Sequence, residues 1–260
     1  MKYKTKLLAD GFADTLSRWP AVECVSLNEA AFPDTLDPYF ALILDVFYSG
    51  AIPGAAERSA LYGKDAAAFE SSGFKDRFLV GDIPVRLEYK ALGNIEELLA
   101  IAETKLDYIW LIKDAGTYGF YRLANGEILF SRNGWIAGIR KKLACLGDVF
   151  WREMRLASQS KMEHYLSDLG AAVFQGDSFN SLISSAGFIK SVCLTLFCLN
   201  RRFEPSHRAY FRQTLELPVL PGAFDAEFDS FLRDDPEMTM ERRYSLAKLI
   251  ARSVIALQVV

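Results

Sequence analysis

One stretch, Phe40-Ala41-Leu42-Ile43-Leu44-Asp45-Val46-Phe47-Tyr48, is apolar apart from a single carboxylate near its middle. Its apolar and aromatic content predicts a buried strand. Because removing an unpaired carboxylate from water is costly, Asp45 needs a partner. Two alternatives stay open on the residues alone. Asp45 could help to hold a divalent metal ion, or it could bond a nearby arginine, tyrosine or backbone amide.

A second stretch, Ile83-Pro84-Val85-Arg86-Leu87-Glu88-Tyr89-Lys90, alternates apolar and charged residues. A period of two places Arg86, Glu88 and Lys90 on one face of a strand. If this strand lies beside the Asp45 strand, the two carboxylates could share a metal ion. The alternative is that Glu88 lies on a solvated face.

The composition describes an ordinary globular protein. The chain has 260 residues, of which 51% are hydrophobic and 24% charged, and its formal net charge is −3. Basic residues are scattered, and adjacent ones such as Lys141-Lys142 and Arg201-Arg202 form only short groups. This charge pattern argues against a nucleic acid as partner.

The four cysteines show no CxxC spacing, and only two histidines accompany them, so a structural zinc site is not expected. The stretch Phe188 to Leu199 is the most apolar late in the chain, but it contains Lys190 and is too short to span a bilayer. We therefore expect no membrane association and a cytoplasmic location. The sequence does not indicate the oligomeric state.

The element pattern predicts an α+β protein in two parts: a mixed sheet with helices over residues 1–131 and an all-helical bundle over residues 132–260. An amphipathic N-terminal helix precedes a short strand at Val22–Leu27. The segment that leads up to Phe69 is predicted to be helical. Asn125-Gly126, between two runs typical of strands, predicts a β-hairpin.

This order of elements resembles the nucleotidyltransferase superfamily, in particular two-domain proteins akin to aminoglycoside nucleotidyltransferases. The stretch Val25-Ser26-Leu27-Asn28-Glu29 is similar to the first-strand signature, with Asn28-Glu29 where Gly-Ser belongs. Asp37-Pro38-Tyr39 is similar to the lead-in of the second strand. The metal-binding Asp-x-Asp positions of the superfamily then fall on Ala41 and Ile43, neither of which can bind a metal.

The resemblance implies that Glu88 matches the third carboxylate of the superfamily. Asp45 lies one strand period beyond the expected pair, on the same side but about 6–7 Å further along. Asp45 and Glu88 are thus the candidate catalytic residues and Mg²⁺ ligands, with Glu29 or Asp37 as a third ligand. Mg²⁺ prefers such oxygen ligands, and in nucleotidyl transfer it would activate the acceptor and stabilise the leaving pyrophosphate.

The resemblance also implies a nucleoside triphosphate and a small-molecule acceptor as partners. The candidate nucleotide-binding residues are Ser26, Asn28, Glu29, Arg86, Lys90 and Lys190. The basic residues around Lys75 and Arg77 could also contact phosphates, although a solvated charged face is the favoured explanation for them.

Three functions stay open at this point. The first is metal-dependent nucleotidyl transfer to a small acceptor through Asp45 and Glu88. The second is a catalytically inactive module of the same fold that binds a nucleotide or another small ligand. The third is a protein-interaction scaffold built on the helical half. Apolar residues at Ala41 and Ile43 favour the second over the first for chemistry.

Overall fold

The computed structural model describes residues 3–28, 42–62 and 66–257. The chain forms two compact units. The first takes the residues up to 109 together with 119–145, and the second takes 110–118 together with the residues from 146 onward. The boundary expected after Ser131 falls inside the first unit, because helix α6 (Trp135–Ala144) packs on strand β1 (Val22–Leu27).

Within the described residues of the first unit, six strands form a mixed sheet in the order β3-β4-β5-β2-β1-β6. Strands β2 and β5 pair in parallel, and the other neighbours are antiparallel. The strands other than β1 are β2 (Leu42–Tyr48), β3 (Ala66–Ser71), β4 (Lys75–Val80), β5 (Ile83–Ala91) and β6 (Glu127–Ser131).

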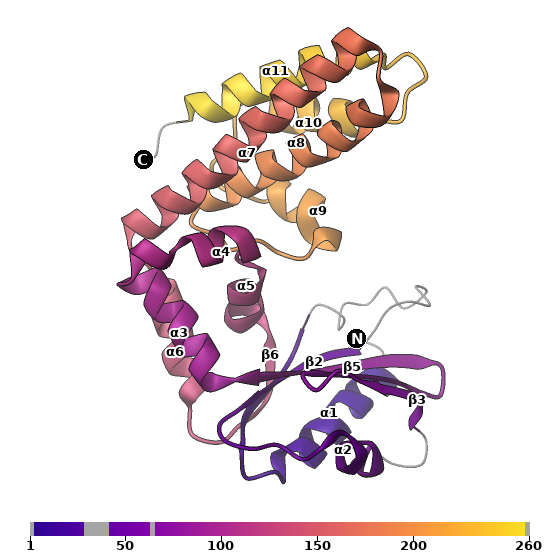
Figure 1. The fold of residues 1–260 in the computed structure, drawn as a ribbon, viewed down its shortest axis with the longest axis vertical. Helices are drawn as coiled ribbons and strands as arrows, with labels where there is room; N and C mark the ends of the chain where they lie inside the picture. The colour runs from indigo at the N-terminus through magenta and orange to yellow at the C-terminus, as the bar shows by residue number, and fades with distance from the viewer. Residues whose placement is uncertain (1–2, 29–41, 63–65, 258–260) are drawn as a thin grey trace. The chain divides into compact units, whose positions relative to one another are not determined.

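Helices α1 (Tyr3–Ser17) and α2 (Ala55–Leu61) cover one face of this sheet, as Figure 1 shows. The predicted apolar stripe of α1 is confirmed, since Phe12 and Leu16 are buried against Val46 and Leu87 in one core cluster. Alternate residues of β2 and β5 fill this core. Because successive side chains of a strand point to opposite faces, the residues between them lie on the other face of the sheet. The unit also contains α3 (Leu92–Glu103) and, from residue 119, α5 (Tyr118–Asn125).

A buried charge anchors α2 to the sheet. Asp76 of β4 is fully buried and accepts two hydrogen bonds from Arg58 of α2, at 2.8 and 2.9 Å. The hydroxyl groups of Tyr62 and Tyr89 donate to the same carboxylate at 2.6 and 2.8 Å. Burial acts to raise the pKa of Asp76, but these donors, led by Arg58, hold it below its usual value. All of these groups serve to hold the core face together.

The second unit is helical, and the expected α+β fold class with a helical second part is confirmed. Its two longest helices, α7 and α8, pack along each other and are joined at Gly176, whose φ of +68° ends α7 in the left-handed conformation that favours glycine. Its α-helices are α4 (Trp110–Ala115), α7 (Asp148–Gln175), α8 (Ser178–Leu199), α9 (Tyr210–Leu215), α10 (Phe224–Leu232) and α11 (Met240–Ala256).

Two predictions of local structure were wrong. The predicted hairpin at Asn125-Gly126 is the junction between helix α5 and strand β6, so only its second half is a strand. The helix predicted to run up to Phe69 ends at Leu61, and strand β3 begins at Ala66. In both places a run of apolar residues fits a helix and a strand equally well, and packing in the folded unit determines which of the two forms.

Helix α8 is long and apolar enough, by length and composition alone, to cross a membrane. Its most apolar 18-residue window is 61% buried inside the protein. Such burial is typical of the core helix of a soluble domain. The cytoplasmic location stays a prediction.

Gly116 has two independent reasons to be glycine. Its φ is +79°, and a Cβ added there would lie 2.7 Å from Oε2 of Glu204. The backbone N–H of Glu204 donates to Oγ1 of Thr117 at 2.9 Å, and the hydroxyl of Tyr210 donates to its carboxylate. Gly116 therefore lets the chain before Thr117 approach a buried carboxylate of the second unit.

We expect Gly116→Ala to lower the free energy of unfolding by about 2 kcal/mol, because alanine is strained at positive φ and displaces Glu204. Urea unfolding followed by circular dichroism measures the change. Gly222→Ala is the matched control, since a Cβ there meets no atom within 4 Å and its φ is not in the left-handed region. Equal unfolding midpoints for the two variants would contradict the role assigned to Gly116.

Candidate functional site

Asp45 and Glu88 are neighbours on the sheet. In the parallel pairing of β2 and β5 they lie directly beside each other. Asp45 is fully buried, and the side chain of Glu88 is 13% exposed. Both carboxylates lie on the face away from α1, because the residues on either side of each in sequence fill the core. The predicted face shared by Arg86, Glu88 and Lys90 is confirmed by this alternation.

Arg122 joins the two carboxylates. It lies on helix α5 and is buried. Its Nε lies 3.0 Å from Oδ2 of Asp45, its Nη2 donates to Oδ1 of the same residue, and its Nη1 lies 2.8 Å from Oε2 of Glu88. One guanidinium group thus makes a two-pronged bond to Asp45 and a third bond to Glu88, which suits its fixed fork of donors.

Further donors complete the coordination of Asp45. The Nζ of Lys90 lies 2.9 Å from Oδ1, and Nδ2 of Asn28 donates to Oδ2 at 2.8 Å. The partner of Asp45 is therefore an arginine, supported by a lysine and an amide, which is one of the alternatives left open by the sequence.

Glu88 lies among four cations. Besides Arg122, it has Nη1 of Arg86 at 3.4 Å, Nζ of Lys75 at 3.8 Å and Nζ of Lys90 at 3.9 Å. Burial acts to raise the pKa of Glu88, but these cations, led by Arg122, hold that pKa below its usual value. The two carboxylates with four cations around them leave this part of the sheet with an excess of positive charge.

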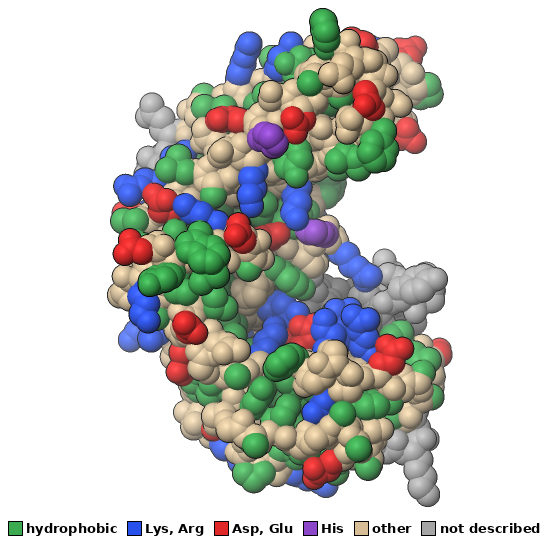
Figure 2. Space-filling model, in the orientation of Figure 1, with side chains coloured by type: hydrophobic (Ala, Val, Ile, Leu, Met, Phe, Trp, Pro, Cys, Tyr) green, Lys and Arg blue, Asp and Glu red, His purple; other side chains and the backbone are tan. Residues whose placement is uncertain are grey.

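Lys90 is also affected by its surroundings. Burial lowers the pKa of Lys90, and the charges of Asp45 and Glu88 oppose that change. The side chain as a whole is 23% exposed, so it is not fully enclosed by the protein. Figure 2 shows Lys and Arg side chains crowded together on the surface of the first unit.

Mg²⁺ does not fit these groups as they are arranged. Each oxygen of Asp45 and of Glu88 faces a guanidinium, ammonium or amide donor, so a metal ion would have to displace cations to bind. Ile43, which the sequence resemblance aligned with a metal-ligand position, has no oxygen in its side chain. Across residues 3–28, 42–62 and 66–257, no three acidic, histidine or cysteine side chains form a group that could hold a metal.

Ser26 and Gly126 lie close together beside this cluster. Ser26 pairs with Asp45 across β1 and β2, and its Oγ is buried with no hydrogen-bond partner in the described part of the chain. A Cβ added at Gly126 would lie 2.8 Å from the carbonyl oxygen of Arg122, 3.1 Å from Oδ1 of Asn28 and 3.2 Å from Oγ of Ser26. Gly126 is thus required for close approach between chain segments and does not serve as a hairpin turn.

The structure brings together part of the predicted set. Ser26, Asn28 and Lys90 lie around Asp45, and Arg86 lies beside Glu88. Lys190 is exposed on α8 of the second unit and is not a member of this cluster. Glu29, Asp37 and Ala41 lie outside the described residues.

Sequence reasoning missed Arg122, the residue that contacts both carboxylates. The signal available was amphipathic spacing in residues 118–125, where Phe120, Arg122 and Leu123 are all buried on one helix. The neighbouring Asn-Gly pair pointed instead to a hairpin, in which Arg122 would have been an ordinary strand residue.

Comparison with known proteins gives two similarities. A family described as a domain of unknown function, DUF4037, matches residues 115–208. The chain is similar to the solved structure of a nucleotidyltransferase-like protein from Exiguobacterium sibiricum 255-15, with 12% sequence identity and a TM-score of 0.49. That match covers 97% of this chain and 74% of the other. No curated protein matches the sequence.

We expect Arg122→Met to lower the free energy of unfolding by about 3–5 kcal/mol, because it leaves buried Asp45 without its main counter-charge. Urea unfolding measures this loss. The double variant Asp45→Leu with Arg122→Met removes both charges and is expected to recover much of it. If the double variant is no more stable than Arg122→Met, the loss of stability in Arg122→Met does not come from leaving Asp45 unpaired.

The same substitution is expected to change the dependence of stability on pH. In the native protein the pKa of Glu88 is lowered, so its ionised form adds stability above the unfolded value of about 4.3, and this is lost as the pH falls. Removal of Arg122 takes away the largest of the effects that lower the pKa of Glu88, so that pKa rises and stability is lost at a higher pH. Urea midpoints measured from pH 3 to pH 7 test this, with Lys113→Met, on the second unit, as control.

Proposed function

We propose that the first unit binds a phosphate-bearing small ligand, in the first instance a nucleotide, without a metal ion and without turnover. The observation that carries this proposal is the guanidinium of Arg122, which contacts both Asp45 and Glu88 where the resemblance would place a metal ion. On this proposal the chain keeps the α+β arrangement of a nucleotidyltransferase but uses fixed cations in place of Mg²⁺.

The local charge supports an anionic ligand. Arg122, Lys90, Lys75 and Arg86 surround two carboxylates, so the excess charge is positive although the whole chain is acidic. Lys75 and Arg86 have side chains about one third exposed, at 35% and 32%, and can reach a ligand from the surface. Charge-assisted hydrogen bonds from such groups are the ordinary means of binding phosphate oxygens.

Buried polar groups at the edge of the cluster support a ligand with hydrogen-bonding atoms. Oγ of Ser26 has unused hydrogen-bonding capacity within the described part of the chain, next to Asn28 and Gly126. A ribose or phosphate oxygen placed there would satisfy that hydroxyl.

Metal-dependent nucleotidyl transfer through Asp45 and Glu88 is the competing proposal. It needs two or three converging carboxylates with oxygens open to the metal. Ile43 and the donors on Asp45 count against it. Only this competing proposal includes a small-molecule acceptor, which the resemblance implies.

The test is calorimetric titration of the full chain with ATP, CTP, GTP and UTP, each in EDTA and in excess Mg²⁺. We expect binding in EDTA, with Lys75→Gln weakening it about tenfold through loss of a charge-assisted contact. Arg18→Gln is the matched control, because it removes an exposed cation at the end of α1, which covers the opposite face of the sheet.

Three results would overturn the proposal in different ways. Binding that requires Mg²⁺ and is lost in Asp45→Asn, a variant that keeps the size of the side chain, would support the metal-dependent enzyme instead. No binding of any nucleotide in either condition would reject both proposals. Retention of full affinity in Lys75→Gln would place the ligand elsewhere on the molecule.

A further inference from the structure

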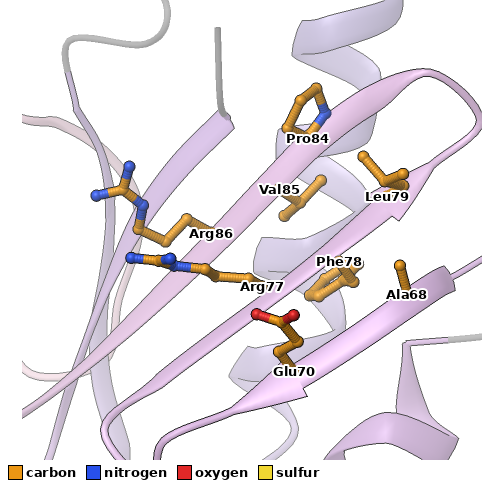
Figure 3. Close-up of a pocket in the computed structure, with 8 residues that line it drawn as sticks. All are labelled: Ala68, Glu70, Arg77, Phe78, Leu79, Pro84, Val85 and Arg86. Atoms are coloured by element: carbon orange, nitrogen blue, oxygen red, sulfur yellow. The ribbon is translucent and has the colours of Figure 1, made fainter. Parts of the chain in front are cut away.

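A groove of about 340 Å³ crosses strands β3, β4 and β5 of the first unit. It is separate from the contacts of Asp45 and Arg122, neither of which lines it. Figure 3 shows the side chains that form it, with two arginines at one end and apolar groups at the other. Its lining includes Ala68, Glu70, Arg77, Leu79, Pro84 and Arg86.

The two arginines face each other directly. Arg77 of β4 and Arg86 of β5 are register partners in the antiparallel pairing. Side chains opposite each other on one face have Cβ atoms about 5 Å apart, and like charges in that position destabilise a sheet. An anion bound between the two guanidinium groups would turn this repulsion into attraction.

The protein neutralises this pair only in part. Arg86 has Glu88 at 3.4 Å, which also fixes its position. Glu70 is the register partner of Arg77 on β3, yet no carboxylate among the described residues lies within 4.0 Å of the Arg77 guanidinium. Arg77 is exposed, and because it has no ion pair with a described residue, it can contact a ligand without breaking one.

The backbone at the edge of the groove is unusual. Ala68 has a φ of +53°, in the left-handed region that few non-glycine residues adopt. The register of β3 on β4 shifts between Ala67 and Glu70, so the strand is irregular where it borders the groove. Backbone strain of this kind concentrates at ligand sites, and here it lies at the apolar end of the groove, as Figure 3 shows.

The other end of the groove is apolar. Leu79 is 37% exposed, and it lies beside Pro84, its register partner on β5. An inorganic anion would use only the arginine end. A ligand that carries its charge on an apolar body would cover both ends.

We propose that this groove is a binding site for a small molecule in which a phosphate or carboxylate group is attached to a compact apolar body. The anionic group binds between Arg77 and Arg86, and the apolar body covers Leu79, Pro84 and Ala68. The site shares Arg86 with the cluster around Glu88, whereas Arg77 takes no part in that cluster, so substitution of Arg77 tests the groove separately from the proposed nucleotide binding.

The test uses NMR chemical-shift titration of the full chain with phenyl phosphate, benzoate, inorganic phosphate and phenol. We expect phenyl phosphate or benzoate to bind more tightly than inorganic phosphate or phenol, with shifts on β3, β4 and β5. Arg77→Gln is expected to weaken that binding about tenfold or more, since it removes charge-assisted hydrogen bonds. Arg18→Gln, the control with the same loss of charge, should leave the affinity unchanged.

Three results would overturn this inference. They are equal binding of inorganic phosphate and phenyl phosphate, affinity unchanged in Arg77→Gln, and shifts confined to residues outside β3, β4 and β5. Lys75→Gln keeps the outcome separate from that of the nucleotide proposal. Phenyl phosphate binding that is lost in Arg77→Gln but kept in Lys75→Gln supports the groove whatever the nucleotide titrations give.

Discussion

The ion pair between Asp45 and Arg122 is the interaction on which the first unit depends. It joins strand β2 to helix α5 across 77 residues of sequence, and both side chains are buried. A carboxylate in that position is acceptable only when a cation meets it. Because α5 leads directly into β6 through Gly126, the same pair also sets where β6 meets β1.

The two faces of the sheet handle buried charge differently. On the face covered by α1 and α2, Asp76 is enclosed by Arg58 and two tyrosine hydroxyls, and nothing is left for a ligand. On the other face the cations outnumber the carboxylates around Asp45 and Glu88. The first arrangement stabilises the fold, whereas the second also produces a positive surface that can attract anions.

The sequence predicted the part of the site that follows from local periodicity. Alternation in β5 predicted that Arg86, Glu88 and Lys90 share a face, and the apolar run around Asp45 predicted a buried strand that needs a partner. It could not predict which partner, because Arg122 reaches Asp45 only through the packing of a helix that is distant in sequence. The Asn125-Gly126 pair misled for a physical reason, since glycine serves both tight turns and close approach.

Arg122 has a consequence for how such a site can change over evolutionary time. Replacement of Ile43 by an acidic residue would place a third carboxylate beside Asp45 and Glu88, which are already paired with cations. The new carboxylate would then pair with one of those cations, and no metal ligand would be gained. Loss of Arg122 first would leave Asp45 buried and uncompensated. Each first step is unfavourable or without effect on its own. Carboxylate-based metal binding could therefore arise here only if both substitutions occurred together, a case of strong epistasis that keeps the present arrangement in place.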